Sequence, residues 1–431
     1  MLFRSLRNAI QTARLAGNIQ QETNAELQLA MSSYASGDAA LAEQYAREAL
    51  NTAQQNQLKD LMVIGLIGLG NAHMLKRDFT GAEKFYLDAL AAARREGLTS
   101  LVARCNFSLA SLHNVLKRNV DAAHEAQEAL NYLQPNHWVQ NTFDMLAVLG
   151  RSQRSQSDYA AAMATFQRLL DTAEKAHNGG QTAVAYEGLG SVLREQEQFP
   201  QALEQYRNDV GASPEGPIGG YARLWCGFLL GQLGHDSDAR AMWDLADRLG
   251  EKFPTLRLAV QEHRANLALI QGDYAKTIEI ANRALAGDTQ QDARSSAAFR
   301  RLLGLARLGS GKRNEGLNDC EQALTMASAL GDPATLLQAR MAAIQARIET
   351  GNLEGARSLF QEVELVLKAH PESRWRVLAM LARADRHYAP VARQALADLE
   401  PQWGKDNFQG YLHRPDIQKL VRPVLDPSLA K

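Results

Sequence analysis

Residues 262–285 read EHRANLALIQGDYAKTIEIANRAL, and this stretch decides the fold of the chain. Apolar residues recur at helical spacing on both sides of the central Gly272-Asp273 pair, which predicts two helices joined by a tight turn. Glycine suits such a turn because a positive φ costs it little. A single pair of helices cannot bury its apolar face alone, so we expect neighbouring pairs to stack on it.

The pattern around Asp273 recurs nine times along the chain, at intervals of 37 to 41 residues. The turn positions, called anchors below, are Asp38, Asp78, Asn119, Asp158, Gln198, His235, Asp273, Lys312 and Asn352. Eight residues before the anchors stand Ala30, Gly70, Ser111, Gly150, Gly190, Gly227, Ala265, Gly304 and Ile344, all small except the last. Four residues after the anchors stand Ala42, Ala82, Ala123, Ala162, Ala202, Ala239, Thr277, Gly316 and Ala356. A fixed period in this range predicts a solenoid.

Large side chains occupy two further positions of the pattern. One residue after many anchors stand Phe79, Tyr159, Phe199, Tyr274 and Leu353. Eight residues after many anchors stand Tyr86, Phe166, Tyr206, Trp243 and Phe360. We expect the small residues to let the two helices of a pair approach closely, and the large residues to fill the remaining space.

These features together resemble the tetratricopeptide repeat. The matching positions are the small residue in the first helix, the Gly-Asp-Tyr-like turn, the alanine early in the second helix, and Ala-Leu pairs such as Ala284-Leu285. The resemblance covers roughly residues 1–400. It implies an all-α fold, a right-handed α-solenoid of about nine to ten helix pairs whose first helices line a concave groove.

The period of this chain is longer than the usual period of about 34 residues, which predicts that both helices are lengthened. Long variants of this kind are typical of helical arms in bacterial signalling proteins, including STAND-type transcription activators and serine/threonine kinases. The tail of this chain, from Trp403 to Leu420, also resembles the terminal segment of such kinases.

The sequence divides into four parts. We expect an N-terminal array over residues 1–210, a Gly/Pro-rich joint over 211–220, a C-terminal array over 221–400 and a capping tail over 401–431. The joint reads GASPEGPIGG, a composition that predicts a loop rather than a helix. The large apolar residues of the tail are expected to cover the last exposed helix face, and they are Trp403, Phe408, Tyr411, Ile417 and Leu420.

The N-terminal array begins with half a repeat. Residues 1–16 have the pattern of a second helix, because Ala9-Ile10 precedes Ala49-Leu50 by one full period. Two interpretations stay open for this helix. The chain is either cut from a longer protein, or the lone helix is itself a cap on the array.

Composition limits the class of protein. A net charge of −1 argues against a protein that coats nucleic acid. No apolar stretch reaches the length of about 18 residues that a membrane-spanning helix needs, and the N-terminus lacks the apolar core of a secretory signal. Three cysteines cannot form a disulfide framework, so we expect reduced thiols in a cytoplasmic protein, with Cys105 facing the groove.

Motifs that carry chemistry are missing from the sequence. It contains no phosphate-binding glycine loop, no kinase signature set and no nucleophile elbow. The ten histidines are scattered, and no pair has metal spacing with a third ligand. The sequence therefore predicts a protein that is not an enzyme and that uses no metal and no cofactor.

The groove supplies the candidate binding residues. If the first helices line it, residues four and seven positions before each anchor face inward, which singles out Asn71, Arg151, Arg154, Arg194 and Asn266. The planar fork of arginine suits a carboxylate or phosphate, with Glu187 neutralising part of the charge. The two asparagines match the groove position where tetratricopeptide domains hold a peptide backbone. Alternatively, the arginines are solvated or ion-paired and the asparagines bind water.

The leading hypothesis is a bacterial interaction scaffold that binds a protein or peptide segment in its groove. The segment is expected to carry an acidic residue between apolar ones, and nucleic acid and membranes are not expected partners. The alternative hypothesis is an effector-sensing regulatory arm of a larger signalling protein, a serine/threonine kinase or transcription activator whose catalytic domain is absent here.

Overall fold

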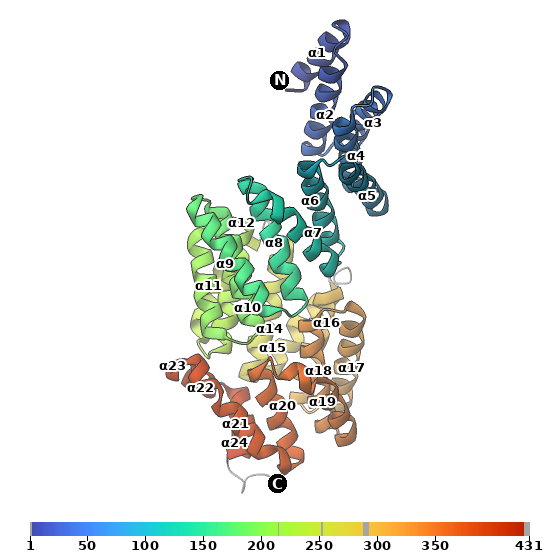
Figure 1. Ribbon diagram of the computed structural model, residues 1–431. Coiled ribbons are helices and arrows are strands. Elements are labelled where there is room, and N and C mark those ends of the chain that lie inside the picture. The colour runs from blue at the N-terminus through green and yellow to red at the C-terminus, as the bar shows by residue number, and fades with distance from the viewer. Residues whose placement is uncertain (1, 214, 251–252, 288–292, 426–431) are drawn as a thin grey trace. The chain divides into compact units, whose positions relative to one another are not determined.

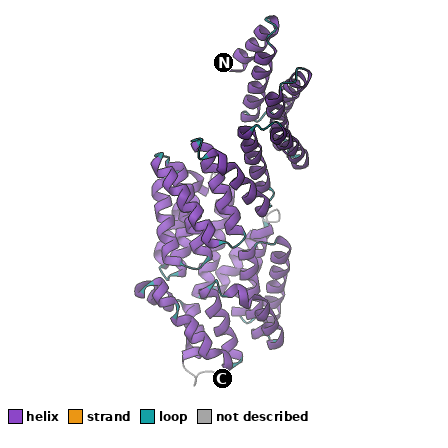
Figure 2. Cartoon of the chain, in the orientation of Figure 1, coloured by secondary structure: helices purple, strands orange, loops and turns teal. Residues whose placement is uncertain are grey.

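The computed structural model describes residues 2–213, 215–250, 253–287 and 293–425, and all regular structure in these ranges is helical (Figure 2). The predicted all-α, right-handed solenoid of helix pairs is confirmed. The helices group into two compact units, unit 1 (Met1–Gln181) and unit 2 (Thr182–Lys431). Each unit is described by itself.

Unit 1 consists of a single helix followed by four antiparallel helix pairs (Figure 1). Its helices are α1 (Leu2–Leu15), α2 (Ile19–Ala35), α3 (Ala39–Gln55), α4 (Lys59–Leu75), α5 (Phe79–Arg95), α6 (Thr99–Val115), α7 (Asn119–Leu133), α8 (Val139–Ser155) and α9 (Tyr159–Lys175). Both helices of most pairs are 17 residues long, as the long period predicts.

Unit 2 continues the pattern and ends in shorter helices. Its helices are α10 (Gly179–Glu195), α11 (Phe199–Ala212), α12 (Gly216–Gln232), α13 (Asp236–Gly250), α14 (Pro254–Gln271), α15 (Tyr274–Ala286), α16 (Ala293–Gly309), α17 (Arg313–Leu330), α18 (Pro333–Glu349), α19 (Leu353–Leu367), α20 (Pro371–Ala384), η2 (Arg386–Tyr388), α21 (Ala389–Ala397), α22 (Leu399–Trp403), α23 (Lys405–Leu412) and α24 (Pro415–Leu425).

Helix capping explains the anchors. The Asp38 carboxylate accepts a hydrogen bond from the backbone N–H of Leu41 at 3.0 Å and so caps α3. The same cap is made by Asp78, Asp158, Asp273 and Asn352. The residue before each of these five capping anchors adopts a positive φ, which is +79° at Gly37.

The small and large positions of the pattern meet inside each pair. A Cβ atom at Gly70 would lie 2.3 Å from the ring of Tyr86, and one at Gly150 would lie 2.8 Å from the ring of Phe166. Both rings are buried. The glycine of the first helix therefore makes room for the aromatic ring of the second helix.

Each unit is curved with its first helices on the inner side. In unit 1, α2 packs against α4, α4 against α6 and α6 against α8; in unit 2 the same holds from α12 through α20. Within the described residues, no two successive second helices pack as closely. The surface formed by the first helices of a unit is called its inner face below.

The Gly/Pro-rich segment is mostly helical, so the prediction of a loop over 211–220 is wrong for most of its length. Gly211 and Ala212 end α11, and Gly216 begins α12 with Pro217 in its first turn. Proline is tolerated there because the first N–H groups of a helix have no partner within the helix. The boundary between the two compact units lies one helix pair earlier, between Gln181 and Thr182. A joint at residues 211–220 therefore stays a prediction.

The C-terminal helices, here called the strap (residues 371–425), pack across turns of earlier pairs in unit 2. The Glu197 carboxylate accepts hydrogen bonds from the N–H and Oγ of Ser373 at 3.0 and 2.5 Å. Trp403 Nε1 donates to the carbonyl of Glu197 at 2.9 Å. Arg414 donates to the carbonyl of Gln232 at 2.8 Å. The apolar tail residues named above are all buried.

Candidate functional site

The inner face of unit 1 exposes large apolar side chains. Met31 and Tyr34 on α2 are 46% and 39% exposed, and Val115 on α6 is 51% exposed. Scattered apolar residues on a surface need no explanation, but these stand on the first helices α2 and α6, four or seven residues before an anchor. An exposed apolar stripe of this kind is typical of a surface that binds a partner.

Arg104 lies on the same face, and sequence reasoning missed it. Its Nη2 atom donates to the Met31 sulfur at 3.6 Å, a contact that joins α6 to α2 across α4. Burial lowers the pKa of the half-buried Arg104 guanidinium. Arg104 stands eleven residues, or three helical turns, before Val115, so the inner stripe contains it. The prediction missed it because only two positions of each first helix were considered.

The side-chain oxygen of Asn71 makes a hydrogen bond within the fold. Tyr86 donates its hydroxyl hydrogen to Asn71 Oδ1 at 2.6 Å, which ties the first helix α4 to the second helix α5. Among the described residues the amide nitrogen of Asn71 makes no hydrogen bond. That nitrogen is therefore the part of Asn71 that can serve a partner.

The other predicted arginines of unit 1 lie on α8. Arg151 and Arg154 are half-buried, and each interacts with other residues of the chain. Burial raises the pKa of Asp144, and the charge of Arg151 offsets part of that rise. Arg151 therefore has a carboxylate within electrostatic range.

Arg194 belongs to unit 2 and is held by its neighbours. Its guanidinium lies over the Trp225 ring, 4.0 Å from the centroid, and Nη2 is 3.6 Å from Glu195 Oε1. Tyr206 contacts it as well, with its hydroxyl 3.5 Å from Nε. Because Arg194 lies in a different unit from Arg151 and Arg154, their predicted grouping stays a prediction.

An aromatic cluster lies beside Arg194 in unit 2 and contacts it through Trp225. The rings of Trp225 and Phe228 lie 5.4 and 5.0 Å from His263 on α14. Burial, aided by nearby arginines, lowers the pKa of His263 to about 3, so the imidazole is neutral at physiological pH. Asn266 follows one turn later on the same helix and is half-buried.

His113 sits in a charged network at the α6–α7 turn. It hydrogen-bonds with Glu125 at 2.7 Å and with Glu83 at 3.1 Å, and Arg118 also contacts Glu83 at 2.6 Å. Burial lowers the pKa of His113, but the two carboxylates outweigh it and leave the pKa raised. The charges compensate one another, so this network ties α5, α6 and α7 together.

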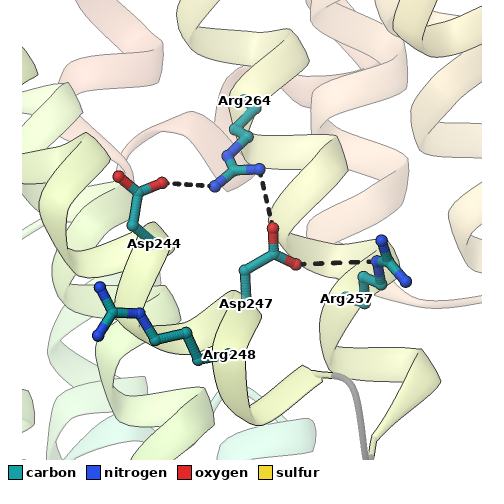
Figure 3. A pocket seen from close by; sticks show the side chains of 5 residues that line it. All are labelled: Asp244, Asp247, Arg248, Arg257 and Arg264. Carbon is teal, nitrogen blue, oxygen red and sulfur yellow. Dashed lines mark hydrogen bonds and ion pairs between the residues drawn. The ribbon is translucent and has the colours of Figure 1, made fainter.

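A hollow of about 220 Å³ lies between α13 and α14, and Figure 3 shows its lining. Arg264 bridges Asp244 at 2.7 Å and Asp247 at 3.0 Å, and Arg257 approaches Asp247 from the other side. The carboxylates are thus already used by arginines of the chain. This hollow is a polar junction between two helices, and it ranks below the inner faces as a binding site.

Cys105 does not face the groove as predicted. It is fully buried in the core shared by α4, α5 and α6, and burial raises its pKa to about 12. It follows Arg104 directly in the sequence, but it packs in the core rather than on the inner face. All three cysteines are buried free thiols.

The comparisons with known proteins agree with the geometry. Residues 141–207 match the profile of the family described as Tetratricopeptide repeat. This part of the chain matches tetratricopeptide repeats. The match spans α8 to α11, and the helix pairs on either side repeat the same turn and packing.

Solved structures share the fold at low identity. A Rap protein complexed with Competence and Sporulation Factor is 15% identical with a TM-score of 0.52, over 89% of this chain and 99% of that chain. The apo form of the quorum sensor NprR from B. thuringiensis is 14% identical with a TM-score of 0.48, over 86% and 97%. No curated protein matches the sequence significantly. These similarities concern the fold of the repeats alone.

The described ranges contain neither a membrane-spanning helix nor a metal-ligand cluster. None of the helices there combines the length and the apolar character that crossing a membrane requires. In the same ranges, no three His, Cys, Asp or Glu residues are placed so that they could share a metal ion.

Proposed function

We propose that this protein is a non-catalytic interaction scaffold whose tetratricopeptide repeats bind a protein or peptide segment on their inner face. The observation that carries the proposal is the exposed apolar stripe of unit 1, formed by Met31, Tyr34 and Val115. Burying one such side chain stabilises a complex by about 1.5–3 kcal/mol. A fold with similar helix pairs supports it, since the Rap protein named above was solved in a complex.

The predicted polar residues have roles in this proposal. The free amide nitrogen of Asn71 donates to a backbone carbonyl of the bound segment, and Asn266 does the same on unit 2. Arg151, Arg154 and Arg194 attract acidic side chains by charge-assisted hydrogen bonds. Trp225 and Glu195 hold the guanidinium of Arg194 in place.

The test is selection of binding peptides from a random library on the full chain, followed by calorimetry on one selected peptide. Val115→Ser removes an exposed apolar group from the inner face and should weaken binding by about tenfold, which corresponds to roughly 1.4 kcal/mol. Val120→Ser is the matched control, because Val120 is 68% exposed but lies on the second helix α7.

Equal affinity of the Val115→Ser and Val120→Ser variants would place the binding surface away from the inner face of unit 1. A library that yields no binding peptide would contradict the scaffold function as stated.

A further inference from the structure

Arg104 is a half-buried cation of unit 1 that has no acidic partner among the described residues. The residues of the described ranges offer its guanidinium no ion pair, and its one hydrogen-bond acceptor is the Met31 sulfur. A thioether is a weak acceptor. By contrast, Arg14 pairs with Glu26 at 2.9 Å, and Arg118 pairs with Asp121 at 2.8 Å.

A half-buried cation without a counter-charge is costly. Removing a charged group from water is compensated only when a partner of opposite charge or good hydrogen bonds replace the water. Arg104 has neither, and its guanidinium lies against the Met31 side chain on the inner face. Such an arrangement is unfavourable in the free protein and becomes favourable when an anion arrives.

The surroundings of Arg104 suit a carboxylate that belongs to a peptide. Its contact with Met31 joins α6 to α2 over α4, so the guanidinium lies beside an exposed apolar side chain of α2, and the exposed Val115 follows on α6. A free inorganic anion would use the charge but leave these groups in water. The flexible side chain of Met31 can give way as a partner enters.

We propose that Arg104 recognises the carboxylate of an aspartate or glutamate in the bound segment, with large apolar side chains on both sides of that residue. The apolar side chains pack on Met31 and Tyr34 at one end and on Val115 at the other. The planar guanidinium of Arg104 donates two parallel hydrogen bonds to the carboxylate. This inference rests on the proposed function and names the chemistry of the partner.

The experiment uses the full chain, a library-selected peptide and its Glu→Gln or Asp→Asn analogue. Arg104→Met keeps the aliphatic stem and removes the charge, and Arg95→Met is the control at a mostly exposed arginine of the same unit. We expect selected peptides to carry an acidic residue between large apolar ones. Arg104→Met should weaken binding of the acidic peptide at least tenfold, whereas Arg95→Met should leave it unchanged.

The amide analogue completes the cycle. Wild type should bind the analogue at least tenfold more weakly than the acidic peptide, and Arg104→Met should bind the two equally, because the carboxylate then has no partner. A melting curve without peptide is a second readout. Arg104→Met should melt at the same temperature as wild type or higher, since it removes an uncompensated charge.

The outcomes separate the two proposals. Selected peptides with no acidic preference, or an unchanged affinity of Arg104→Met, would overturn the role of Arg104 and leave the scaffold function standing. A lowered melting temperature for Arg104→Met would show a structural role and also overturn it. A library without any binding peptide would overturn both proposals. Binding of acetate or phosphate as tightly as the peptide would contradict the claim that apolar side chains of the peptide pack on Met31, Tyr34 and Val115.

Discussion

Gly70 shows how a single residue sets the distance between the two helices of a repeat. A Cβ atom there would lie 2.3 Å from the Tyr86 ring, and the hydrogen bond between Tyr86 and Asn71 holds that ring in place. Gly70→Ala should therefore lower the free energy of unfolding by about 1–3 kcal/mol, the usual range for overpacking, although alanine is the better helix former. Urea denaturation followed by circular dichroism measures the change.

The matched control is Gly211→Ala in the last turn of α11. No atom outside its own neighbours lies within 4 Å of a Cβ atom at Gly211. The same substitution should therefore be neutral or stabilising by up to about 1 kcal/mol. If both variants lose equal stability, the close packing of Gly70 on Tyr86 does not cause the loss in the free energy of unfolding.

Asp209 gives the stability of the chain a pH dependence. It is fully buried on α11, and neither carboxylate oxygen has a hydrogen-bond partner among the described residues. Burial, together with the charge of Glu187, raises the pKa of Asp209 to about 8. A raised pKa contributes stability that is present below the unfolded value and is lost as the pH rises through about 8.

Asp209→Asn removes this titration and changes the shape little. Its free energy of unfolding should rise relative to wild type by at least about 1.4 kcal/mol between pH 5 and pH 9, since one pKa unit corresponds to that energy. Chemical denaturation at a series of pH values gives the difference. A constant difference across the range would show that Asp209 is ionised in the folded protein.

Some residue-scale features follow from the sequence and others do not. The pairing of Gly70 with Tyr86 was predictable, because both stand at fixed distances from the anchor. Arg104 and Asp209 were not, because their burial depends on how neighbouring repeats pack on them. A side chain that spans two helix pairs, as Arg104 does, has no partner in the pattern of its own repeat.

At the scale of elements, the turns show which residues tolerate a left-handed backbone. Glycines hold this conformation in five of the turns within pairs, but Ser157 also adopts it, with φ at +61°. Any residue other than glycine, asparagine or aspartate is strained there. The sequence predicted the glycine turns, and it left Ser157 unmarked because serine is common in every kind of turn.

A reciprocal exchange tests this strain. Ser157→Gly should raise the free energy of unfolding by up to about 1 kcal/mol, and Gly37→Ser should lower it by a similar amount. Both positions precede a capping aspartate, and nothing lies within 4 Å of a Cβ atom at Gly37, so the backbone alone decides the effect. Thermal melting measures both effects. Melting temperatures that shift in the same direction in the two variants would refute the claim that the left-handed backbone strains serine.

At the scale of the whole molecule, the strap is what the repeat pattern alone does not predict. Glu197 and Ser373 are joined across 176 residues, and Trp403 reaches the same turn. Burial and the nearby Glu372 raise the pKa of Glu197 to about 8, so this junction is both buried and titratable. The apolar residues of the tail were predicted to cover the last exposed helix face, but contacts over such separations have no local signal in a sequence.

Truncating Trp403 should therefore have a distant effect within unit 2. Its ring lies 5.1 Å from that of Phe199, and Trp403→Ala should increase hydrogen exchange at the α10–α11 turn. Trp138→Ala, at a partly exposed tryptophan of unit 1, should leave that turn unchanged. Equal exchange at the turn in wild type and Trp403→Ala would mean that the strap does not support the earlier pairs.

The central claim is that the inner face of unit 1 binds the partner segment, and methyl NMR on the ten methionines tests it most directly. Met31 and Met74 lie on first helices of unit 1, whereas Met163 and Met326 lie on second helices. On adding a library-selected peptide, we predict that the methyl signals of Met31 and Met74 shift and those of Met163 and Met326 stay. Shifts confined to Met163 and Met326 would contradict the account.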